Sequence, residues 1–342
     1  MVDEKRLVNM IYTETGSTDP TYNLAFEEYF LREHTDFPQI MMLWQNNNAV
    51  IIGRYQNAER EINVQAAKRL EVKVVRRSTG GGAVYHDLGN LNYSFIHTTA
   101  STEGLELSET ARPMAEALNR LGIPAEIHGR NDIVVNGRKI SGTAQSFQSG
   151  RLLHHGTLLF DSNLSILQEV LNVDQSKIIS KGVASVKSRV VNIRECMAWN
   201  IGIMEFWQKI KNEFSDLIPY HPTEQDIAAI RKLQETKYRA WDWSHGSAPA
   251  YDYENSKRFA GGRIEVAMHI RKGFVKDCRI SGDFLGMVDI KDLENTLVGL
   301  RYAPDSIREG LGGLPLPLSM YLGGIDGEEF LLCMFEDILA EI

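Results

Sequence analysis

The chain has 342 residues, of which 43% are hydrophobic and 24% are charged, as in ordinary globular proteins. Its net charge of −8 excludes a general nucleic-acid-binding surface, because such a surface has to be basic. A single core rarely grows beyond about 250–300 residues, so this length predicts one large domain and one smaller domain.

The sequence lacks the signals of a membrane protein or a disulfide-rich secreted protein. Its three cysteines are scattered and form no CxxC pair, which predicts neither a disulfide framework nor a cysteine zinc site. The charged first residues lack the apolar region of a signal peptide, and no run reaches the roughly 18 apolar residues of a membrane span. We expect a cytoplasmic protein with no membrane or nucleic-acid partner.

The first part of the chain predicts alternating helices and strands. Apolar residues recur at helical spacing in "YNLAFEEYFLRE", and two apolar runs flank the Asn-rich residues 45–48. The expected elements are a helix over 22–33, a hairpin over 39–57, a helix over 63–71 and strands over 72–77, 83–86 and 91–97. The glycines Gly80, Gly81 and Gly82 therefore lie in a strand–loop–strand.

The middle of the chain predicts a second hairpin followed by helices. Asn136-Gly137 is a strong hairpin turn signal, and Thr223 is a suitable helix N-cap. The expected elements are a helix over 108–123, a hairpin over 132–146, a strand over 151–161 and helices over 164–172, 203–214 and 223–237.

The last part of the chain predicts a small separate domain. Residues 243–252 are rich in aromatic, Gly, Ser and Pro residues without a period, as is typical of a linker. Two alternating strands over 263–280 then pair through Lys272-Gly273, and three helical segments follow. The fold class is α/β (α+β), with a large domain over 1–245 and a small α+β domain over 246–342.

The stretch "RRSTGGGAVYHD" carries the clearest chemical signal. Glycine is the default residue where a turn needs positive φ, but three in a row cost backbone entropy, which favours close approach of a ligand. Exposed N–H groups beside Arg76 and Arg77 suit an anion, although the pattern is neither a Walker A loop nor GxGxxG. A structural turn and an anion site both remain open, and Arg76 either reaches the ligand or packs outward.

Two further stretches hold candidate residues. In "GRNDIVVNGRKISGTAQ", Lys139 stands beside small residues that leave room for a ligand, while a solvated charged strand is the plain alternative. In "LLHHGTLLF", His154 and His155 are neighbours on a strand and point to opposite faces, so they do not form a metal pair. One of the two is expected to be a core histidine.

Five segments in order resemble the lipoate–protein ligase A family. They are "YNLAFEE", "VVRRSTGGGAVYHDLGNLNYSF", "GRNDIVVNGRKISGTAQ", "HHGTLLF" and "KGVASVKSRVVNI", and the linker and last hairpin resemble the family's accessory domain. The resemblance covers nearly the whole chain. It implies a two-sheet catalytic domain of the biotin/lipoate ligase type plus an accessory domain. It also implies ATP-dependent formation of lipoyl-AMP, then transfer of lipoyl to a lysine of a lipoyl domain, in 2-oxo-acid dehydrogenase E2 subunits or the glycine cleavage H protein.

The resemblance also implies roles for individual residues. Lys139 matches the family's essential lysine, which contacts the lipoate carboxylate and the α-phosphate. The expected ATP and adenylate contacts are Arg77, Gly80, Gly81, Gly82, Ala83, Val84, Tyr85, Asn131, Asp132 and Lys181. The expected lipoate contacts are Lys139, His86, Trp44 and His155, although a core tryptophan is an equal alternative for Trp44. Asp132 either holds Mg²⁺, which accompanies ATP, or orients Lys139.

Other functions remain as alternatives. An octanoyl or lipoyl transferase of the same fold would use a cysteine thioester in place of ATP, but no cysteine lies near Lys139 in the sequence. A biotin–protein ligase would carry a GRGR-type loop, which this sequence lacks. A binder without activity would not need Arg77, Lys139 and Asp132. One departure from the family is Ser146, where a member can carry an arginine. An apolar chain-shaped pocket discriminates weakly, so octanoate is expected to be accepted to some degree.

Overall fold

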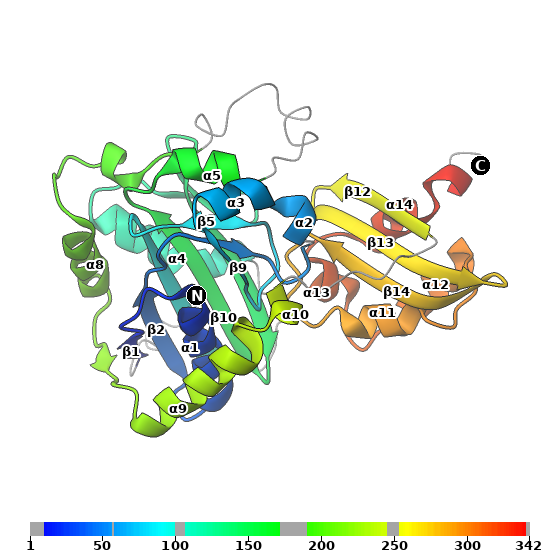
Figure 1. The fold of residues 1–342 in the computed structure, drawn as a ribbon, viewed down its shortest axis with the longest axis horizontal. Helices are drawn as coiled ribbons and strands as arrows, with labels where there is room; N and C mark the ends of the chain where they lie inside the picture. Colours follow the sequence, from blue (N-terminus) through cyan, green and yellow to red (C-terminus); the bar gives the residue numbers. More distant parts are fainter. Residues whose placement is uncertain (1–9, 57, 100–106, 172–189, 245–252, 340–342) are drawn as a thin grey trace, which may run out of the picture. The chain divides into compact units, whose positions relative to one another are not determined.

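The computed structural model describes residues 10–56, 58–99, 107–171, 190–244 and 253–339, which are coloured in Figure 1. The chain forms two compact units. Unit 1 contains Met1–Ile51, Glu59–Arg76 and Val84–Ser244, and unit 2 contains Ile52–Ala58, Arg77–Ala83 and His245–Ile342. Two short segments that precede the expected boundary at residues 245 and 246 therefore belong to unit 2.

Unit 1 is built on a mixed eight-stranded sheet in the order β11-β1-β2-β6-β10-β9-β8-β7. Strand β1 runs parallel to β2 and β11, and the strands from β2 to β7 pair antiparallel. The strands are β1 Met10–Glu14, β2 Gln39–Trp44, β6 Asn90–Thr98, β7 Glu126–His128, β8 Asp132–Val135, β9 Arg138–Gln148, β10 Arg151–Leu159 and β11 Ile218–Pro219.

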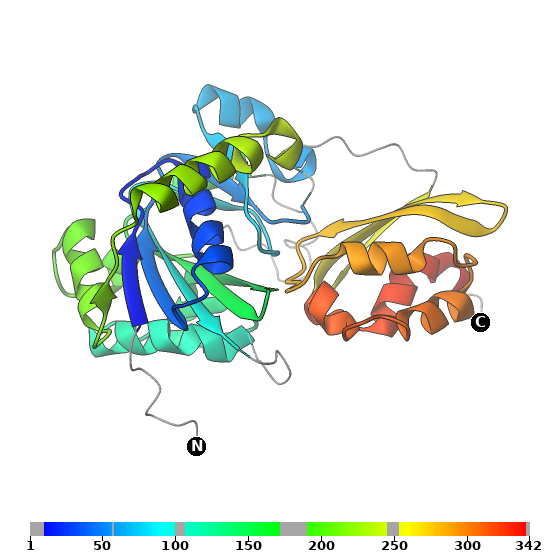
Figure 2. The same ribbon diagram turned by 90° about the horizontal axis from the view of Figure 1, so that it is seen from below.

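Helices cover both faces of this sheet, as Figure 2 shows. Helices α1 (Pro20–Glu33) and α9 (Glu224–Leu233) pack on one face, and α4 (Leu107–Arg120) and α8 (Ile203–Asn212) pack on the other. Each face has its own buried apolar cluster, so each helix buries its apolar stripe against the sheet. The other helices among the residues described before position 245 are α2 Ala58–Glu61, α3 Val64–Arg69, α5 Leu164–Val170, α10 Trp241–Ser244, the 3₁₀ helix η1 Ile193–Cys196 and the π-helix η2 Gln234–Tyr238.

Helix α1 is fixed at both ends. Asp19 is its N-cap, accepting a hydrogen bond from Thr21 N at 3.1 Å. At the other end the buried guanidinium of Arg151 donates to carbonyl oxygens at the end of α1 and beyond, those of Phe30, Leu31, His34 and Phe37. A cation there complements the negative end of the helix dipole. The helix therefore holds its side chains at a defined place over the sheet.

The expected hairpin over 39–57 is wrong. Both edges of β2 are occupied by β1 and β6, so β2 has no edge left for the next strand. The Asn-rich residues instead carry the chain into a second sheet of order β4-β3-β5, formed by β3 Ala49–Ile52, β4 Lys73–Arg76 and β5 Val84–His86. Asn48 makes this crossing with φ of 46°, a conformation that asparagine tolerates well.

Several local predictions are confirmed. The glycines 80–82 lie between β4 and β5, as a strand–loop–strand. Asn136 and Gly137 join β8 to β9 with φ of 50° and 72°, the positive values of a type I′ turn. Thr223 is the N-cap of α9, and its hydroxyl accepts from Asp226 N at 3.2 Å. These features depend on two to four neighbouring residues, so the sequence alone defines them.

Unit 2 contains a three-stranded antiparallel sheet, β12 Tyr253–Phe259, β13 Gly262–Arg271 and β14 Phe274–Gly282. Buried residues alternate along β13, and helices cover that face (Figure 2). The turn at Lys272-Gly273 is confirmed. The sequence missed β12, whose residues are mostly polar, and predicted three helices where the described chain has four: α11 Lys291–Leu297, α12 Pro304–Leu311, α13 Leu318–Leu322 and α14 Gly327–Leu339.

Candidate active site

The strand register of unit 1 places predicted site residues in one row across the sheet. Trp44 on β2 pairs with Asn92 on β6, and Asn92 pairs with Thr157 on β10. Thr157 Oγ1 accepts a hydrogen bond from Gly142 N at 3.2 Å, and Gly142 on β9 pairs with Asp132 on β8. Cross-strand partners share a face of the sheet. Trp44 and Asp132 therefore lie at the two ends of one row on the same face.

A β-bulge brings Lys139 onto this face. Asp132 pairs with Gly142 but Val134 pairs with Lys139, so the register shifts by one residue between the two pairs. In a regular strand Lys139 and Gly142, three residues apart, would point to opposite faces. The extra residue of the bulge cancels that alternation, so Lys139 shares the face of Asp132.

Lys139 and Asp132 form an ion pair. Lys139 Nζ lies 2.6 Å from Asp132 Oδ1, and each side chain is 32% exposed. A Cβ atom at Gly142 would lie 2.8 Å from Lys139 Nζ, so the missing side chain of glycine leaves the space that the ammonium occupies. A partly exposed pair adds little stability. The contact holds the ammonium beside the carboxylate on this face of the sheet.

Hydrogen bonds from the backbone and from the Asn131 side chain hold the chain around Lys139. Thr143 N donates to Asn131 O at 2.8 Å, and Asn131 Nδ2 donates to Thr143 O at 3.2 Å. The described chain resumes at Val190, which pairs in parallel with Lys139, and the next residue, Val191, donates from N to Lys139 O at 3.0 Å. Lys181, which the sequence assigned to the adenylate site, lies outside the described residues.

A buried hydrogen-bond chain joins two predicted lipoate contacts. His155 Nδ1 lies 2.9 and 3.0 Å from the carboxylate oxygens of Glu27. Ser94 Oγ donates to Glu27 Oε1 at 2.5 Å, and Trp44 Nε1 donates to Ser94 Oγ at 2.9 Å. All four residues are buried. Glu27 was not predicted from the sequence, although an acidic residue within the apolar spacing of a helix is a signal for such a role.

His154 lies on the opposite face of β10, as the strand period predicts. Its Nδ1 lies 2.9 Å from Thr110 Oγ1 on α4, and its ring lies 5.9 Å from the ring of Tyr93. Burial lowers the pKa of His154 to about 3, so the imidazole is neutral. His154 is therefore a core histidine, and only His155 shares the face of Lys139.

Strand β5 carries two further predicted residues, which the structure uses differently. The His86 ring lies 6.4 Å from the Trp44 ring, and its Nδ1 lies 3.0 Å from Asn46 Nδ2. Tyr85 is buried and donates from its hydroxyl to Asn48 Oδ1 at 3.0 Å. Burial raises the pKa of Tyr85 to about 12. The side chain of Tyr85 thus packs within the fold, whereas His86 lies beside Trp44.

The Gly-rich loop belongs to unit 2, where Arg77 holds it together. The buried guanidinium of Arg77 donates to Thr79 Oγ1 at 2.9 Å, to Gly80 O at 2.6 Å and to Gly82 O at 2.9 Å. These acceptors all lie within five residues of Arg77. The guanidinium therefore organises its own loop.

The three glycines have different structural reasons. A Cβ at Gly80 would lie 2.6 Å from the carbonyl oxygen of Phe284, and Gly81 has φ of 91° and donates from N to Phe284 O at 2.9 Å. Packing and backbone conformation within unit 2 account for both. At Gly82 no atom of the described residues lies within 4 Å of the Cβ position, so packing among them does not account for this glycine.

The Arg76 side chain is buried against the end of helix α10, within unit 1. Its Nε donates to Trp243 O at 2.8 Å and its Nη2 donates to Ser244 O at 3.0 Å, while Trp243 Nε1 donates to Arg76 O at 2.9 Å. Arg76 thus caps the C-terminal end of α10, a favourable place for a cation. Of the two adjacent arginines, Arg76 is committed to this helix end.

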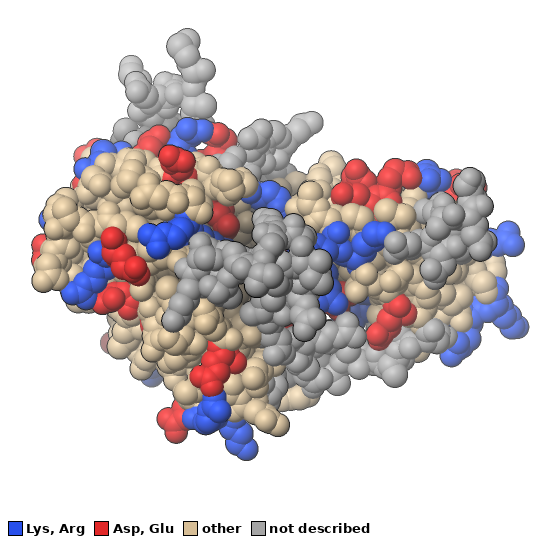
Figure 3. Space-filling view, turned by 90° about the horizontal axis from the view of Figure 1, so that it is seen from above, with Lys and Arg blue, Asp and Glu red and all other residues tan. Residues whose placement is uncertain are grey.

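Three properties of the described residues concern metal binding, surface charge and membrane spanning. Across residues 10–56, 58–99, 107–171, 190–244 and 253–339, no group of three His, Cys, Asp or Glu residues is arranged to hold a metal ion. Figure 3 shows Lys and Arg side chains interspersed with Asp and Glu over the face that it draws. No helix among the described residues is long and apolar enough to cross a membrane.

Unit 1 presents the ion-paired Lys139 on one face of a mixed sheet, and the chain has a smaller second unit. A family model for the lipoyl protein ligase A/B catalytic domain matches residues 19–215, and one for the bacterial lipoate protein ligase C-terminus matches residues 248–334. The chain belongs to the lipoate–protein ligase family, and it is a ligase.

Individual relatives agree with this assignment. The lipoate-protein ligase LplJ of Bacillus subtilis is 40% identical over 319 residues, which cover 92% of this chain and 96% of the relative. The structure of P. falciparum LipL1 in complex with lipoate has a TM-score of 0.74 at 27% identity and covers 90% of this chain and 94% of that one. A structure of lipoate-protein ligase A bound with ATP has a TM-score of 0.58 at 28% identity, covering 70% and 98%.

Proposed function

We propose that this ligase works in two steps, with residues 1–245 as its catalytic domain and 246–342 as its accessory domain. In the first step an oxygen of the lipoate carboxylate attacks the α-phosphorus of ATP, and the bond to pyrophosphate breaks. The product is lipoyl-AMP. In the second step the ε-amine of a lysine on a lipoyl domain attacks the lipoyl carbonyl carbon. The bond to AMP then breaks, and the amine loses one proton.

The observation that carries this proposal is the oriented ammonium of Lys139. The first step brings a carboxylate against an anionic α-phosphate, and fixed positive charge must offset their repulsion. Lys139 Nζ stands on the open face beside Asp132, with space left by Gly142. An ammonium with three donors can contact both oxygens and later the bridging oxygen of the adenylate.

The acyl chain would lie against the buried wall that Trp44, His86 and His155 form on the same side of unit 1. Each methylene removed from water contributes about 0.8 kcal/mol. A pocket that recognises a chain by its methylenes discriminates weakly. Octanoate is therefore expected to be activated as well, more slowly than lipoate.

Asn131, Asp132 and Lys181 would contact the nucleotide in unit 1. The Gly-rich loop of unit 2 is proposed by itself as a further nucleotide contact. We propose that Arg77, which donates to the carbonyl oxygens of Gly80 and Gly82, also contacts a phosphate with its guanidinium. Ala83, Val84 and Tyr85 would contact the nucleotide through their backbone, since the Tyr85 hydroxyl is bound to Asn48. Gly82 offers the open backbone at which a ligand can approach closely.

Magnesium would enter with ATP. We propose Asp132 as its carboxylate contact, because Mg²⁺ commonly takes one or two carboxylates together with substrate phosphates. When bound, Mg²⁺ neutralises charge on the phosphates. The protein partners would be lipoyl domains of E2 subunits and the glycine cleavage H protein, as the family membership implies.

The test measures pyrophosphate release and lipoyl transfer separately. Purified enzyme with ATP, Mg²⁺ and lipoate should release pyrophosphate, and an added lipoyl domain should gain one lipoyl group by mass spectrometry. Lys139→Ala should lower both signals by about 10²–10³-fold. Pyrophosphate release that needs no lipoate, or transfer from an acyl-carrier protein without ATP, would contradict the proposal.

A further inference from the structure

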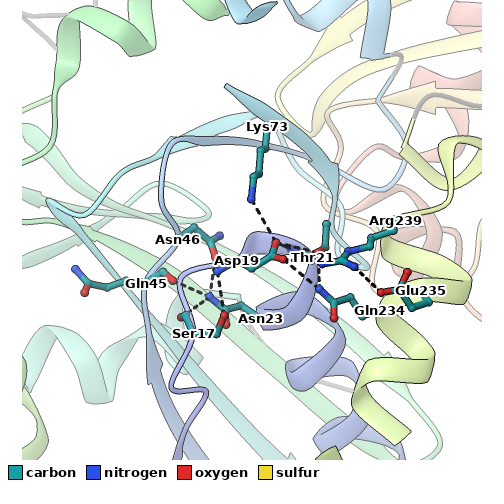
Figure 4. Close-up of polar contacts among 10 residues, drawn as sticks. All are labelled: Ser17, Asp19, Thr21, Asn23, Gln45, Asn46, Lys73, Gln234, Glu235 and Arg239. Carbon is teal, nitrogen blue, oxygen red and sulfur yellow. Dashed lines mark hydrogen bonds and ion pairs between the residues drawn. The ribbon is translucent and has the colours of Figure 1, made fainter. Parts of the chain in front are cut away.

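A chain of amide groups leads from helix α1 to His86. Asn23 on α1 is fully buried, and its Nδ2 lies 2.6 Å from the carbonyl oxygen of Gln45 and 3.1 Å from that of Ser17 (Figure 4). A carbonyl oxygen can only accept a hydrogen bond. The atom of Asn23 that faces both must therefore be its nitrogen, so the orientation of this amide is determined by its surroundings.

The orientation of Asn46 follows from that of Asn23. Asn46 Oδ1 lies 2.9 Å from Asn23 Nδ2, as Figure 4 shows, and Asn46 is also fully buried. If the Asn46 amide were turned over, two NH₂ groups would face each other in a buried place, which costs the hydrogen bond and leaves donors opposed. The oxygen of Asn46 therefore faces Asn23, and its NH₂ group faces His86.

The protonation of His86 follows in turn. Asn46 Nδ2 lies 3.0 Å from His86 Nδ1, and an amide nitrogen donates but does not accept. Nδ1 must therefore accept, so it carries no proton, and the neutral ring carries its proton on Nε2. We infer that Asn23 and Asn46 hold His86 as the Nε2–H tautomer, so that His86 acts in the site as a hydrogen-bond donor and not as a base.

The consequence for the reaction rests on the proposed function. Transfer of lipoyl requires the incoming amine to lose a proton, and a histidine near the acyl pocket is an obvious candidate base. His86 is excluded, since Nδ1 is occupied by Asn46 and Nε2 already carries its proton. A neutral N–H donor suits instead an oxygen of the acyl group, whose negative charge grows when the amine attacks. Asn46 is then a positioning residue, because it acts through His86.

The tautomer can be observed without any substrate. In enzyme with ¹⁵N-labelled histidine, the His86 signals, identified by their loss in His86→Gln, should show an unprotonated Nδ1 and a protonated Nε2. Asn46→Asp is nearly isosteric, and its second carboxylate oxygen demands a proton on Nδ1, so the pattern should change to a protonated Nδ1. As a control, Asn119→Ala removes an amide on α4 that bonds to Ala115 O and Ala125 O, and it should leave the His86 pattern unchanged.

The role of His86 can be separated from its tautomer by kinetics. The amide NH₂ of glutamine can replace an Nε2–H donor but cannot act as a base. His86→Gln should therefore keep the rate of lipoyl transfer within about tenfold, while His86→Ala loses about 10²-fold, as for removal of an oxyanion donor. Asn46→Asp should lower the rate by about tenfold or more while tryptophan fluorescence reports a folded unit 1.

Two results would overturn the inference. One is a protonated Nδ1 on His86 in the unaltered enzyme, and the other is a His86→Gln variant as slow as His86→Ala. The NMR result does not depend on the identity of the acyl substrate, because that measurement uses none. If lipoate fails to support pyrophosphate release while Nδ1 is unprotonated, the proposed function fails and the tautomer assignment stands.

Discussion

Lys139 and Arg77 are both cations next to glycines, yet the two units hold them differently. Lys139 remains one-third exposed, with its ammonium 2.6 Å from Asp132. Arg77 is 6% exposed and donates to three oxygen atoms of its own loop. The bulged strand leaves the Lys139 ammonium partly exposed, whereas the Arg77 guanidinium is buried and donates hydrogen bonds to its own loop. Two cations that both stand next to glycines in the sequence thus differ in how exposed they are to an approaching anion.

The same contrast holds for the neighbouring glycines. Gly142 makes room for the flexible end of Lys139, whereas Gly80 makes room for the backbone of Phe284. Substitutions on the sheet should therefore change the rate, and substitutions in the loop should change stability. The two units can be followed separately, because all five tryptophans lie in segments assigned to unit 1.

The largest effect is expected from Lys139→Ala. Loss of the ammonium should lower lipoate-dependent pyrophosphate release by about 10²–10³-fold, as for other charge-stabilising donors. The free energy of unfolding from tryptophan fluorescence should change by less than about 0.5 kcal/mol, because the ion pair is partly exposed. A large loss of stability would mean that Lys139 is mainly structural, and the contrast between the regions would then fail.

Gly80→Ala should instead destabilise unit 2. The new Cβ would lie 2.6 Å from Phe284 O and 3.2 Å from Gly286 N, and backbone atoms cannot move aside as a side chain can. Overpacking of this kind costs about 1–3 kcal/mol. Urea titrations should show this loss by circular dichroism, while the tryptophan signal of unit 1 shifts less.

Gly82→Ala is the matched control for Gly80→Ala. Within the part of the chain that the structure describes, no atom lies within 4 Å of the Cβ position at Gly82, so the variant should unfold like the unaltered protein. If a nucleotide approaches this backbone, the KM for ATP should rise severalfold. A variant with unaltered stability and unaltered KM would show that no ligand comes close at Gly82.

Gly142→Ala should affect rate with little loss of stability. Its Cβ would lie 2.8 Å from Lys139 Nζ and 3.0 Å from Cε, and both atoms belong to the mobile end of the side chain. The ammonium should move away from Asp132, and adenylation should slow about tenfold, or about 1.4 kcal/mol. If Gly142→Ala lost as much stability as Gly80→Ala, the expected difference between the sheet and the loop would be contradicted.

The smallest effect is a pH dependence confined to unit 1. The pKa of His154 falls from 6.5 to about 3 on folding, so between these values the unfolded chain binds a proton that the folded chain does not. Stability from this group is therefore present above pH 6.5 and is lost as the pH falls, by about 0.8 kcal/mol at pH 6. Tryptophan-monitored urea titrations at pH 7.5 and pH 6 should show this difference, and His154→Gln should reduce it. An unchanged difference in the variant would assign the pH dependence to other groups.

Much of the site could be predicted from short motifs. Lys139, Asp132 and the Asn136-Gly137 turn lie within eight residues, and Trp44, His86 and His155 were predicted from their segments. Partners separated in sequence could not be predicted in the same way. Glu27 meets His155 across 128 positions, and Asn23 meets Asn46 across 23, so only the packing of α1 on the sheet brings them together.

The expected hairpin over 39–57 shows a second limit. Strand propensity and turn residues were read correctly, since β2 and β3 both exist. Their partners were not, because a strand pairs with whichever neighbour reaches its edge, and β1 and β6 already occupy the edges of β2. Pairing is a competition among distant segments, which local sequence does not record.

By itself the sequence determined the family, the catalytic lysine candidate and the local turns, because these depend on residue types at short spacing. Tertiary structure decided how the two arginines of "RRSTGGG" are used, which glycines packing requires, and on which face Lys139 stands. The physical reason is that a one-residue bulge reverses the face of a side chain, and a buried donor turns to whatever acceptor the fold places beside it.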